Sequence, residues 1–574
     1  MAPQTRPASF QATRLTRSHP LCIYPLGNAL LDGDAPRRRR AGLGAFSRCD
    51  DEVVLAILRW LSPESLARGA CASGTLRAYA YQEEFWKEFC VAKVLAGAPF
   101  VWPAKARAEE NCNEEGEDEE GSWRLAYTAM QVGGSSASSA ARKSTIKKRV
   151  YSDVLYRSFY YAACELDPHW FSRENMAQID AGSITVEDFI RDYERKSVPV
   201  LLKGAGKDWP SMNSWSRETL VERFPEADFL SGPCEIPLKE FYKYADRNMD
   251  DTPLFVFCRR FGQKAPAMLQ EYKVPEVFRN RDLFDLLGEH RPANRWLLVG
   301  NKRSASKWHI DPNKTCAWNT VVKGRKRWLM LPPGCVPPGV FTDGADVTQP
   351  VSLVEWFCNF YRQLRELADT SPAWDLKEVT CGPGDCVFVP CGWWHCVLNL
   401  DDDTIAITQN YCSEAVVHSV RRFLREKKDL VSGIRGEDRE VLWQLFDEAL
   451  ARERPDLLNA EAAKAELEAE YHAQAVKEAS PSESPSASGS AGGSFSFWDH
   501  LRSTGRSLGF ASQAPEAAMT RTVSRDTSSS SSDEEEDEQE AKEEDGGLSA
   551  AKRRKLDGGC AVDATIESQS PTSA

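Results

Sequence analysis

The order of apolar and polar positions divides the chain into regions of different character. Between residues 46 and 100, apolar side chains recur at the spacing of one helix face, as at Val54, Ile57, Leu58 and Leu61. Ser62 followed by Pro63 predicts the start of a further helix, because a hydroxyl caps the first turn and proline suits the first helical position. We therefore expect a small all-α domain at 46–100.

Residues 150–415 instead show short β-type runs separated by turn residues. Thr315–Val322 alternates like a strand, Lys323 and Gly324 predict a turn, and Lys326–Leu331 is expected to return as the second strand of a hairpin. Further strands are predicted at Cys386–Val389, within Gly392–Asn399, and at Thr404–Gln409. Strands that follow one another without intervening helices indicate an antiparallel barrel with a roomy mouth. Residues 416–475 have helical spacing and predict C-terminal helices.

The remaining segments are expected to be disordered. Residues 1–45 form a Pro- and Arg-containing leader, for which an organelle transit peptide is an alternative interpretation. Residues 101–149 are an acidic and Ser-rich linker, and residues 476–574 are a Ser-rich and acidic tail. Such segments bury too little apolar area to fold. The basic cluster Lys552–Lys555 fits a nuclear-import signal. We therefore expect the protein to be located in the nucleus, and the cytoplasm is an additional expected location.

Composition narrows the functional classes. The chain has 574 residues, of which 42% are hydrophobic, and a formal net charge of −13. Two acidic runs, at 109–120 and 533–545, account for more than this whole charge, so the acidity does not describe a binding surface. No apolar run is long enough for a membrane helix, and no arginine–aromatic ladder for nucleic acid stands out. The 17 cysteines, an odd and scattered set, indicate free thiols in a reducing compartment.

One constellation points to metal chemistry. His309 and Asp311 stand two residues apart, and on a strand such residues point to the same face. A second histidine, His395, opens another β-type run. Two imidazoles and one carboxylate form the facial triad of non-haem Fe(II) oxygenases, which leaves positions for a 2-oxo acid and for O2. The motif alone is weak, because a histidine beside an acid is often a structural pair.

The predicted hairpin strengthens the metal interpretation. It would bring Lys326 beside the first strand, where a buried cation requires an anionic partner. The distal carboxylate of 2-oxoglutarate would be that partner. A surface lysine within the basic run at 323–327 is the alternative.

Several stretches together resemble a known family. They are Asp250–Phe257, Tyr272–Pro275, His309–Pro312, Ala317–Asn319, Gly324–Trp328, Gly392–His395, Asn399–Asp401 and Thr404–Asn410. Residues 150–415 thereby resemble a Jumonji-C (JmjC) 2-oxoglutarate oxygenase. The most similar branch is that of the bifunctional arginine demethylases and lysyl-hydroxylases, also called phosphatidylserine-receptor-like proteins. The resemblance implies a mainly β, double-stranded β-helix (cupin or jelly-roll) fold with surrounding helices.

The resemblance also implies roles for single residues. It makes His309, Asp311 and His395 the iron ligands and the catalytic centre. It places Lys326 against the distal carboxylate of 2-oxoglutarate, with Asn319, Thr408 and Ser306 completing the cosubstrate site. Phe255 stands where that branch has a tyrosine, so one hydrogen bond to the cosubstrate is expected to be absent. Lys307 and Trp308 stand where that branch has small or aliphatic residues. Because of these differences, the resemblance does not determine which substrate the chain uses.

The helical unit at 46–100 resembles an F-box, although Arg48 and Cys49 stand where an F-box begins with Leu-Pro. An F-box would bind the Skp adaptor of a cullin–RING ubiquitin ligase. The alternative is an ordinary helical unit packed on the barrel.

The hypothesis that follows is an oxygenase that uses Fe(II), 2-oxoglutarate and O2. It would hydroxylate lysine, or demethylate methylated arginine or lysine, in nuclear proteins such as histones or splicing factors. Two alternatives belong to other classes: an F-box adaptor whose cupin domain binds targets without turnover, and a metal-bound cupin with a structural or receptor role. The sequence does not separate hydroxylation from demethylation, because both start by removing a hydrogen atom from carbon.

Overall fold

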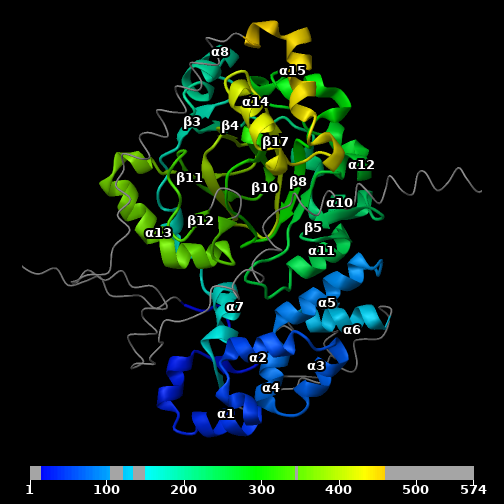
Figure 1. Cartoon of the computed structure of the whole chain (residues 1–574), viewed down its shortest axis with the longest axis vertical. Coiled ribbons are helices and arrows are strands. Elements are labelled where there is room, and N and C mark those ends of the chain that lie inside the picture. Colours follow the sequence, from blue (N-terminus) through cyan, green and yellow to red (C-terminus); the bar gives the residue numbers. More distant parts are fainter. Residues whose placement is uncertain (1–13, 104–120, 133–148, 343–346, 459–574) are drawn as a thin grey trace, which may run out of the picture. The chain divides into compact units, whose positions relative to one another are not determined.

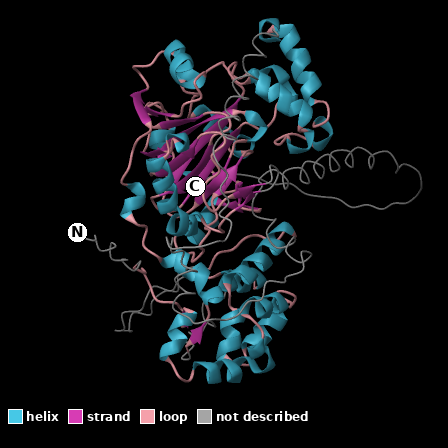
Figure 2. Ribbon diagram, turned by 60° about the vertical axis from the view of Figure 1, so that its left-hand side comes forward, coloured by secondary structure: helices cyan, strands magenta, loops and turns pink. Residues whose placement is uncertain are grey.

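The computed structural model describes residues 14–103, 121–132, 149–342 and 347–458. Along the chain, helices precede and follow a large β region, and others, such as α13, come between its strands (Figures 1 and 2). The helices of the N-terminal part are α1 (Ala35–Leu43), α2 (Asp51–Leu58), α3 (Pro63–Ala70), α4 (Gly74–Ala80), α5 (Glu83–Leu95) and α6 (Trp123–Gln131). The later helices are α7 (Asp153–Ala163), α8 (Val186–Phe189), α9 (Ser211–Ser214), α10 (Arg217–Arg223), α11 (Leu238–Ala245), α12 (Phe261–Lys264), α13 (Leu353–Thr370), α14 (Val417–Glu426) and α15 (Leu442–Glu453).

Helix α3 begins where the sequence places its cap. The hydroxyl of Ser62 accepts a hydrogen bond from the backbone N–H of Ser65 at 3.3 Å, so α3 starts at Pro63 as predicted. On α2, Val54 and Leu58 are buried, but Ile57 is 41% exposed. The apolar face of α2 is therefore narrower than the spacing suggested.

Residues 14–45 differ from the expected disordered leader. The two-residue strand β1 (Ile23–Tyr24) pairs in parallel with β2 (Val150–Tyr151), and α1 follows. Ile23 is completely buried, and the hydroxyl of Tyr151 donates to the carboxylate of Asp32 at 2.7 Å. This segment is ordered because it buries apolar residues against a part of the chain far away in sequence. Residues 1–13 lie outside the described residues.

The expected linker at 101–149 also contains ordered structure. Trp123, at the start of α6, is 1% exposed, and its ring centroid lies 5.2 Å from that of Trp102. Its indole N–H donates to Asp250 at 2.9 Å. The two aromatic rings bury a large apolar area, which stabilises the fold of this segment. Acidic side chains bury no comparable area. Residues 104–120 and 133–148 lie outside the described residues, as do 459–475 and the whole tail, so the nuclear-import signal stays a prediction.

Two sheets form the β region. The larger has nine strands in the order β3 (Ala177–Asp180), β4 (Val200–Lys203), β15 (Cys386–Val389), β10 (Cys316–Lys323), β17 (Thr404–Tyr411), β8 (Arg295–Gly300), β7 (Val256–Cys258), β5 (Asp228–Ser231) and β6 (Cys234–Pro237). The smaller has four, in the order β14 (Lys377–Cys381), β11 (Lys326–Leu331), β16 (Trp394–Asn399) and β9 (Ala305–His309). A separate pair joins β12 (Phe341–Thr342) to β13 (Val347–Thr348).

The expected hairpin at 315–331 is wrong in its pairing. Both strands exist, but β10 belongs to the larger sheet and β11 to the smaller. The chain changes sheet at Gly324, which has φ +73° and where a Cβ atom would lie 2.6 Å from the carbonyl oxygen of Asp403. Nearly every residue of β10 and β11 is buried, so each strand is covered on both faces. A single two-stranded hairpin would leave one face of each strand in water.

The same change of sheet recurs along the chain. β15 and β16 are consecutive but lie in different sheets, and so do β16 and β17. Strands that alternate between two facing sheets are the pattern of a jelly roll, so the expected double-stranded β-helix is confirmed. After the barrel, α14 and α15 pack on the segment 283–290, where Phe284 and Phe446 have ring centroids 5.0 Å apart.

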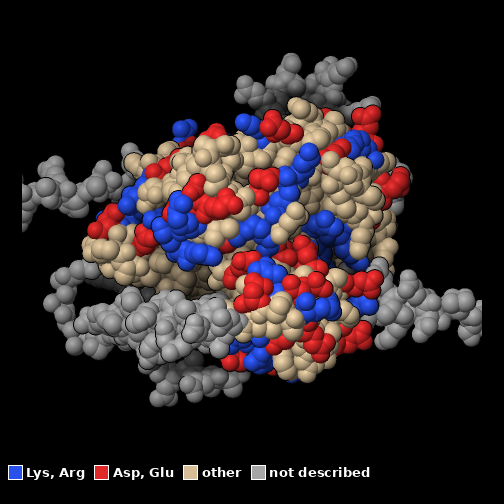
Figure 3. Space-filling view, turned by 90° about the horizontal axis from the view of Figure 1, so that it is seen from above, with Lys and Arg blue, Asp and Glu red and all other residues tan. Residues whose placement is uncertain are grey.

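Charged side chains of both signs are interspersed on the described surface seen in Figure 3. Several form ion pairs, such as Arg425 with Asp447 and Arg454 with Glu414. In the described part of the chain, no helix combines the length and the apolar composition needed to cross a lipid bilayer.

A fully buried ion pair fixes the outer face of the smaller sheet. Arg327 and Glu378 have no exposed side-chain surface and lie 2.9 Å apart, and the hydroxyl of Tyr361 donates to the same carboxylate at 2.8 Å. We predict that Glu378→Ala lowers the free energy of unfolding by about 3–5 kcal/mol, because it leaves a buried guanidinium without its partner. Denaturant unfolding measures the change.

The exposed pair Arg362–Glu366 on α13 provides the matched control, since Glu366→Ala should cost no more than about 1 kcal/mol. Equal effects of the two substitutions would contradict this account of the buried pair.

Candidate metal centre

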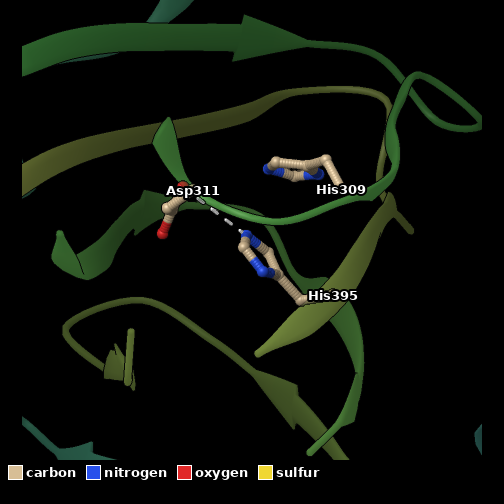
Figure 4. Close-up of side chains that lie close together, drawn as sticks. All are labelled: His309, Asp311 and His395. Atoms are coloured by element: carbon tan, nitrogen blue, oxygen red, sulfur yellow. Dashed lines mark ion pairs between the residues drawn. The ribbon is translucent and has the colours of Figure 1, made fainter. Parts of the chain in front are cut away.

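Three side chains converge at the junction of β9 and β16. Ligand atoms of His309, Asp311 and His395 all lie within 4.8 Å of one another, and the side chains point toward a common centre (Figure 4). The imidazole centroids are 4.1 Å apart, and His395 Nε2 lies 3.9 Å from Asp311 Oδ1. Among the described residues, this is the one group of three or more such side chains arranged to hold an ion.

Strand pairing brings the two histidines together. His309, the last residue of β9, lies directly opposite His395 on β16 in the antiparallel register, where cross-strand neighbours are close enough for their side chains to meet. Asp311 lies just beyond the end of β9, in extended backbone with φ −59° and ψ 142°. It therefore reaches the same centre although the strand has ended.

Backbone carbonyls orient both imidazoles. Nδ1 of His309 lies 2.7 Å from the carbonyl oxygen of Lys307, and Nδ1 of His395 lies 3.0 Å from that of Trp393. Because a carbonyl only accepts hydrogen bonds, each Nδ1 carries the proton and each Nε2 keeps its lone pair. Burial, reinforced by the neighbouring His309, lowers the pKa of His395 to about 4, so its imidazole is neutral near pH 7.

These features fit a divalent cation. Two neutral imidazole nitrogens and a carboxylate are the donors of the facial triad that binds Fe(II). Oδ2 of Asp311 is buried without any hydrogen-bond partner in the structure, and a buried carboxylate oxygen left unpaired is costly. A bound cation at the centre would relieve that cost.

Lys326 lies on the neighbouring strand with its side chain buried. It is 5% exposed, and burial lowers its pKa to about 8. No carboxylate pairs with its ammonium among the residues that the structure describes. In register, Lys326 stands opposite Asn399 and Met330 stands opposite His395. Four residues thus separate the two positions along β16, about 13 Å between backbones, which leaves room for a dicarboxylic acid between metal centre and ammonium.

The other predicted cosubstrate residues lie on both sheets. Asn319 of β10 and Thr408 of β17 are direct cross-strand partners in the larger sheet. Asn319 Oδ1 is buried without a hydrogen-bond partner, and the Thr408 hydroxyl donates to the carbonyl of Trp318 at 3.0 Å. Ser306 of β9 stands opposite Val397, two residues beyond His395. The structure therefore places Ser306 on the face that carries the histidines.

Two further residues of the site are not apparent from the motif. Trp328 lies two residues after Lys326 on β11, and its ring stacks on His395 with centroids 5.9 Å apart and planes at 22°. Asn399 Oδ1 is buried and unpaired, opposite Lys326. Alternation from His395 predicts the inner face for Asn399, and alternation from Lys326 along β11 does the same for Trp328.

Phe255, the position that departs from the related branch, lies near Asn399. An atom added at Cα of Gly300 would lie 2.6 Å from the Asn399 side chain and 3.3 Å from Cβ of Phe255. Phe255 is therefore close to Asn399, which faces Lys326 across the strand pair. Its ring carries no hydroxyl, so a ligand next to Lys326 receives no hydrogen bond from this position.

Comparison with known proteins agrees with the fold. Residues 234–415 match the family model described as "Cupin-like domain". The chain is 36% identical to the arginine-specific demethylase JMJ22 of Arabidopsis thaliana over 450 residues, which cover 77% of this chain and 83% of that protein. This match is longer than residues 150–415 alone.

Two other relatives match a shorter part of the chain. The bifunctional arginine demethylase and lysyl-hydroxylase psr-1 of Caenorhabditis elegans is 32% identical over 265 residues, 43% of this chain and 64% of that protein. The human 2-oxoglutarate and iron-dependent oxygenase JMJD4 is 25% identical over 276 residues, with the same shares. The extent of the JMJ22 match, the cupin-like region and the jelly-roll topology lead to one conclusion: the chain belongs to the JmjC family of 2-oxoglutarate- and iron-dependent oxygenases.

Proposed function

We propose that this chain uses Fe(II), 2-oxoglutarate and O2 to hydroxylate lysine, or to demethylate methylated arginine or lysine, in nuclear proteins such as histones or splicing factors. One observation carries the proposal. The facial triad of His309, Asp311 and His395 opens onto the same barrel interior as the buried, unpaired ammonium of Lys326. The names of JMJ22 and psr-1, a demethylase and a demethylase–hydroxylase, support this substrate class.

When bound, ferrous iron with 2-oxoglutarate supplies the oxidising chemistry. One O2 and one 2-oxoglutarate yield CO2, succinate and one oxygen atom inserted into a substrate C–H bond. On a lysine side chain the product is hydroxylysine. On an N-methyl group the product is an N-hydroxymethyl group, which breaks down to formaldehyde and the demethylated nitrogen.

The residues of the chain bind and orient the reactants. The Nε2 lone pairs of His309 and His395 and the free oxygen of Asp311 would hold the metal. The Lys326 ammonium would bind the distal carboxylate of 2-oxoglutarate, exchanging an unpaired buried charge for a charge-assisted hydrogen bond. Trp328 and Val397, which are buried on the inner face, keep water away from the reacting centre.

An aromatic surface beside this site favours a cationic substrate. Phe257 of β7 and Trp296 of β8 are half-buried, and their rings stack with centroids 5.6 Å apart. Trp296 is the cross-strand partner of Thr408, so it lies on the face that carries the cosubstrate residues. Aromatic faces attract ammonium and guanidinium groups, which are the groups of lysine and arginine.

The first test concerns the metal ligand. With Fe(II), 2-oxoglutarate and a pool of lysine- and methylarginine-containing peptides, the wild-type protein should form succinate and an oxidised or demethylated peptide. Asp311→Ala should lower the rate by at least about 100-fold, because even groups that only support metal ligands contribute 10- to 100-fold. Asp369→Ala, which removes an exposed carboxylate on α13, is the matched control.

Mass spectrometry reads the peptide product: one added oxygen on lysine identifies a hydroxylase, and loss of a methyl group identifies a demethylase. Equal succinate from Asp311→Ala and wild type would refute the proposed activity.

The second test uses the pH dependence of cosubstrate binding. Without 2-oxoglutarate, the lowered pKa of Lys326, about 8, makes the ammonium the main form only below that pH. A bound dianion favours the ammonium and raises its pKa. Affinity for 2-oxoglutarate should therefore be constant below pH 8 and fall up to about tenfold per pH unit above it. Calorimetric titration of the Mn(II)-loaded protein measures this dependence.

Two variants separate Lys326 from other titrating groups. Lys326→Arg keeps its charge at every accessible pH, so its affinity should not fall above pH 8. Lys326→Met should bind 2-oxoglutarate about 10- to 100-fold more weakly at pH 7, without loss of stability in the ligand-free protein, because the buried charge is removed. A wild-type profile that matches that of Lys326→Arg would contradict the role of Lys326.

A second candidate function is adaptor activity through the F-box-like region. It is favoured by the apolar side chains that α2 and the turn after it leave exposed: Val53 at 47%, Ile57 at 41% and Trp60 at 92%. Their spacing of four and three residues puts them on one side of the helix, as expected for a surface that binds a partner helix. The partner would be the Skp adaptor of a cullin–RING ligase.

We expect purified Skp to form a complex with the wild-type chain, and Trp60→Ala to weaken it about tenfold or more, as the loss of a central aromatic contact does. Phe341→Ala, which removes an exposed aromatic side chain of the β12–β13 pair, should leave binding unchanged. Size-exclusion chromatography and calorimetry measure the complex. Failure of the wild-type chain to bind Skp would eliminate this second function.

A further inference from the structure

Strand β9 contains an irregularity next to the metal centre. In its pairing with β16, His309 stands opposite His395, and Ser306 stands opposite Val397, with a register shift between these pairs. Two residues of β9, Lys307 and Trp308, thus face the single residue 396 of β16. One extra residue in an antiparallel strand is a β-bulge, a device that changes the direction in which side chains point.

The bulge determines which face His309 occupies. In a regular strand, residues three apart point to opposite faces, so Ser306 and His309 could not both face inward. The extra residue returns His309 to the inner face. Trp308 then points outward, where it is 1% exposed and its ring centroid lies 5.1 Å from that of Trp356 on α13. The carbonyl of Lys307, also in the bulge, holds Nδ1 of His309 at 2.7 Å.

The backbone of the bulge is completed by a side chain. Among the described residues β9 is the last strand of its sheet, so no described strand pairs with its outer edge. The side-chain amide of Gln349 takes that place at Trp308: Oε1 accepts from the Trp308 N–H at 3.0 Å, and Nε2 donates to the Trp308 carbonyl at 2.9 Å. The amide thereby makes both hydrogen bonds that a paired strand residue would make.

The segment that carries Gln349 is itself fixed. The backbone N–H of Val351 donates to Glu355 at 3.1 Å, and its carbonyl accepts from the hydroxyl of Thr252 at 3.2 Å. Glu355 in turn pairs with Arg157 of α7. Gln349 therefore projects toward β9 from an anchored segment. If its side-chain amide is removed, the segment is held in place and does not move to supply the two lost hydrogen bonds.

We propose that Gln349 is a positioning residue for the metal ligand His309. By clamping the backbone of Trp308, it fixes the bulge that turns His309 inward and aligns its Nε2 with Asp311 and His395. This inference rests on the proposed function, since it assigns Gln349 a role in the affinity of the same metal site.

The test compares metal affinity with folding stability. We measure the dissociation constant of Mn(II), a redox-stable substitute for Fe(II), by calorimetry, and the melting temperature of the metal-free proteins. Gln349→Met keeps the length of the side chain and removes both hydrogen bonds. It should weaken Mn(II) binding about 10- to 100-fold, the range found when groups that support a metal ligand are lost. Thr348→Val, at the exposed neighbouring position, should bind Mn(II) like the wild type.

A second variant guards against a general effect on folding. Gln349→Glu keeps an acceptor for the Trp308 N–H but sets a carboxylate oxygen against the Trp308 carbonyl, so it should also bind Mn(II) more weakly than the wild type. Wild-type affinity in both Gln349 variants would overturn the inference, as would a lowered melting temperature with unchanged affinity. Absence of Mn(II) binding by the wild-type protein would instead refute the proposed function, and the inference with it.

Discussion

The pairing of β9 with β16 is the contact on which the metal centre depends. It sets His309 opposite His395 in a barrel in which strands β8 to β11 and β14 to β17 alternate between the two sheets. With Ser306 opposite Val397, the two histidines meet only because of the bulge; a regular strand would set Trp308 opposite His395 and turn His309 to the other face. A small irregularity at the edge of the smaller sheet thus decides whether the fold has a place for an ion.

The interior of this barrel holds polar groups that the fold alone does not satisfy. Oδ1 of Asn319, Oδ1 of Asn399 and Oδ2 of Asp311 are buried without a hydrogen-bond partner. Among the described residues, no carboxylate pairs with the buried ammonium of Lys326. A protein selected only for stability would fill these positions with apolar side chains, because unpaired buried polar groups are costly. The same four groups complement a divalent cation and a dicarboxylate, which are the ligands of the proposed function. On the outer face of the same sheet, by contrast, the buried charge of Arg327 forms an ion pair with Glu378.

The sequence predicted the site better than it predicted the path of the chain. His-x-Asp spacing, a later histidine and the resemblance to the JmjC family together pointed to three residues that the structure places within 4.8 Å of one another. Local alternation located β10 and β11 but assigned them to one hairpin, since sequence spacing does not reveal that a chain crosses to another sheet at Gly324. The order of residues 14–45 and of the helix at Trp123 also escaped local reasoning, because both depend on burial against residues more than 100 positions away, as between Ile23 and Val150. No sequence pattern indicated a role for Gln349. Its role becomes apparent only from its hydrogen bonds to Trp308 at the outer edge of β9.

A crystal structure of the protein with Mn(II) and N-oxalylglycine, an inert analogue of 2-oxoglutarate, tests the central claim most directly. The account predicts one ion per chain bound by His309, Asp311 and His395, with the distal carboxylate of the analogue about 3 Å from Nζ of Lys326. An ion bound elsewhere, or an analogue whose distal carboxylate lies away from Lys326, would contradict it.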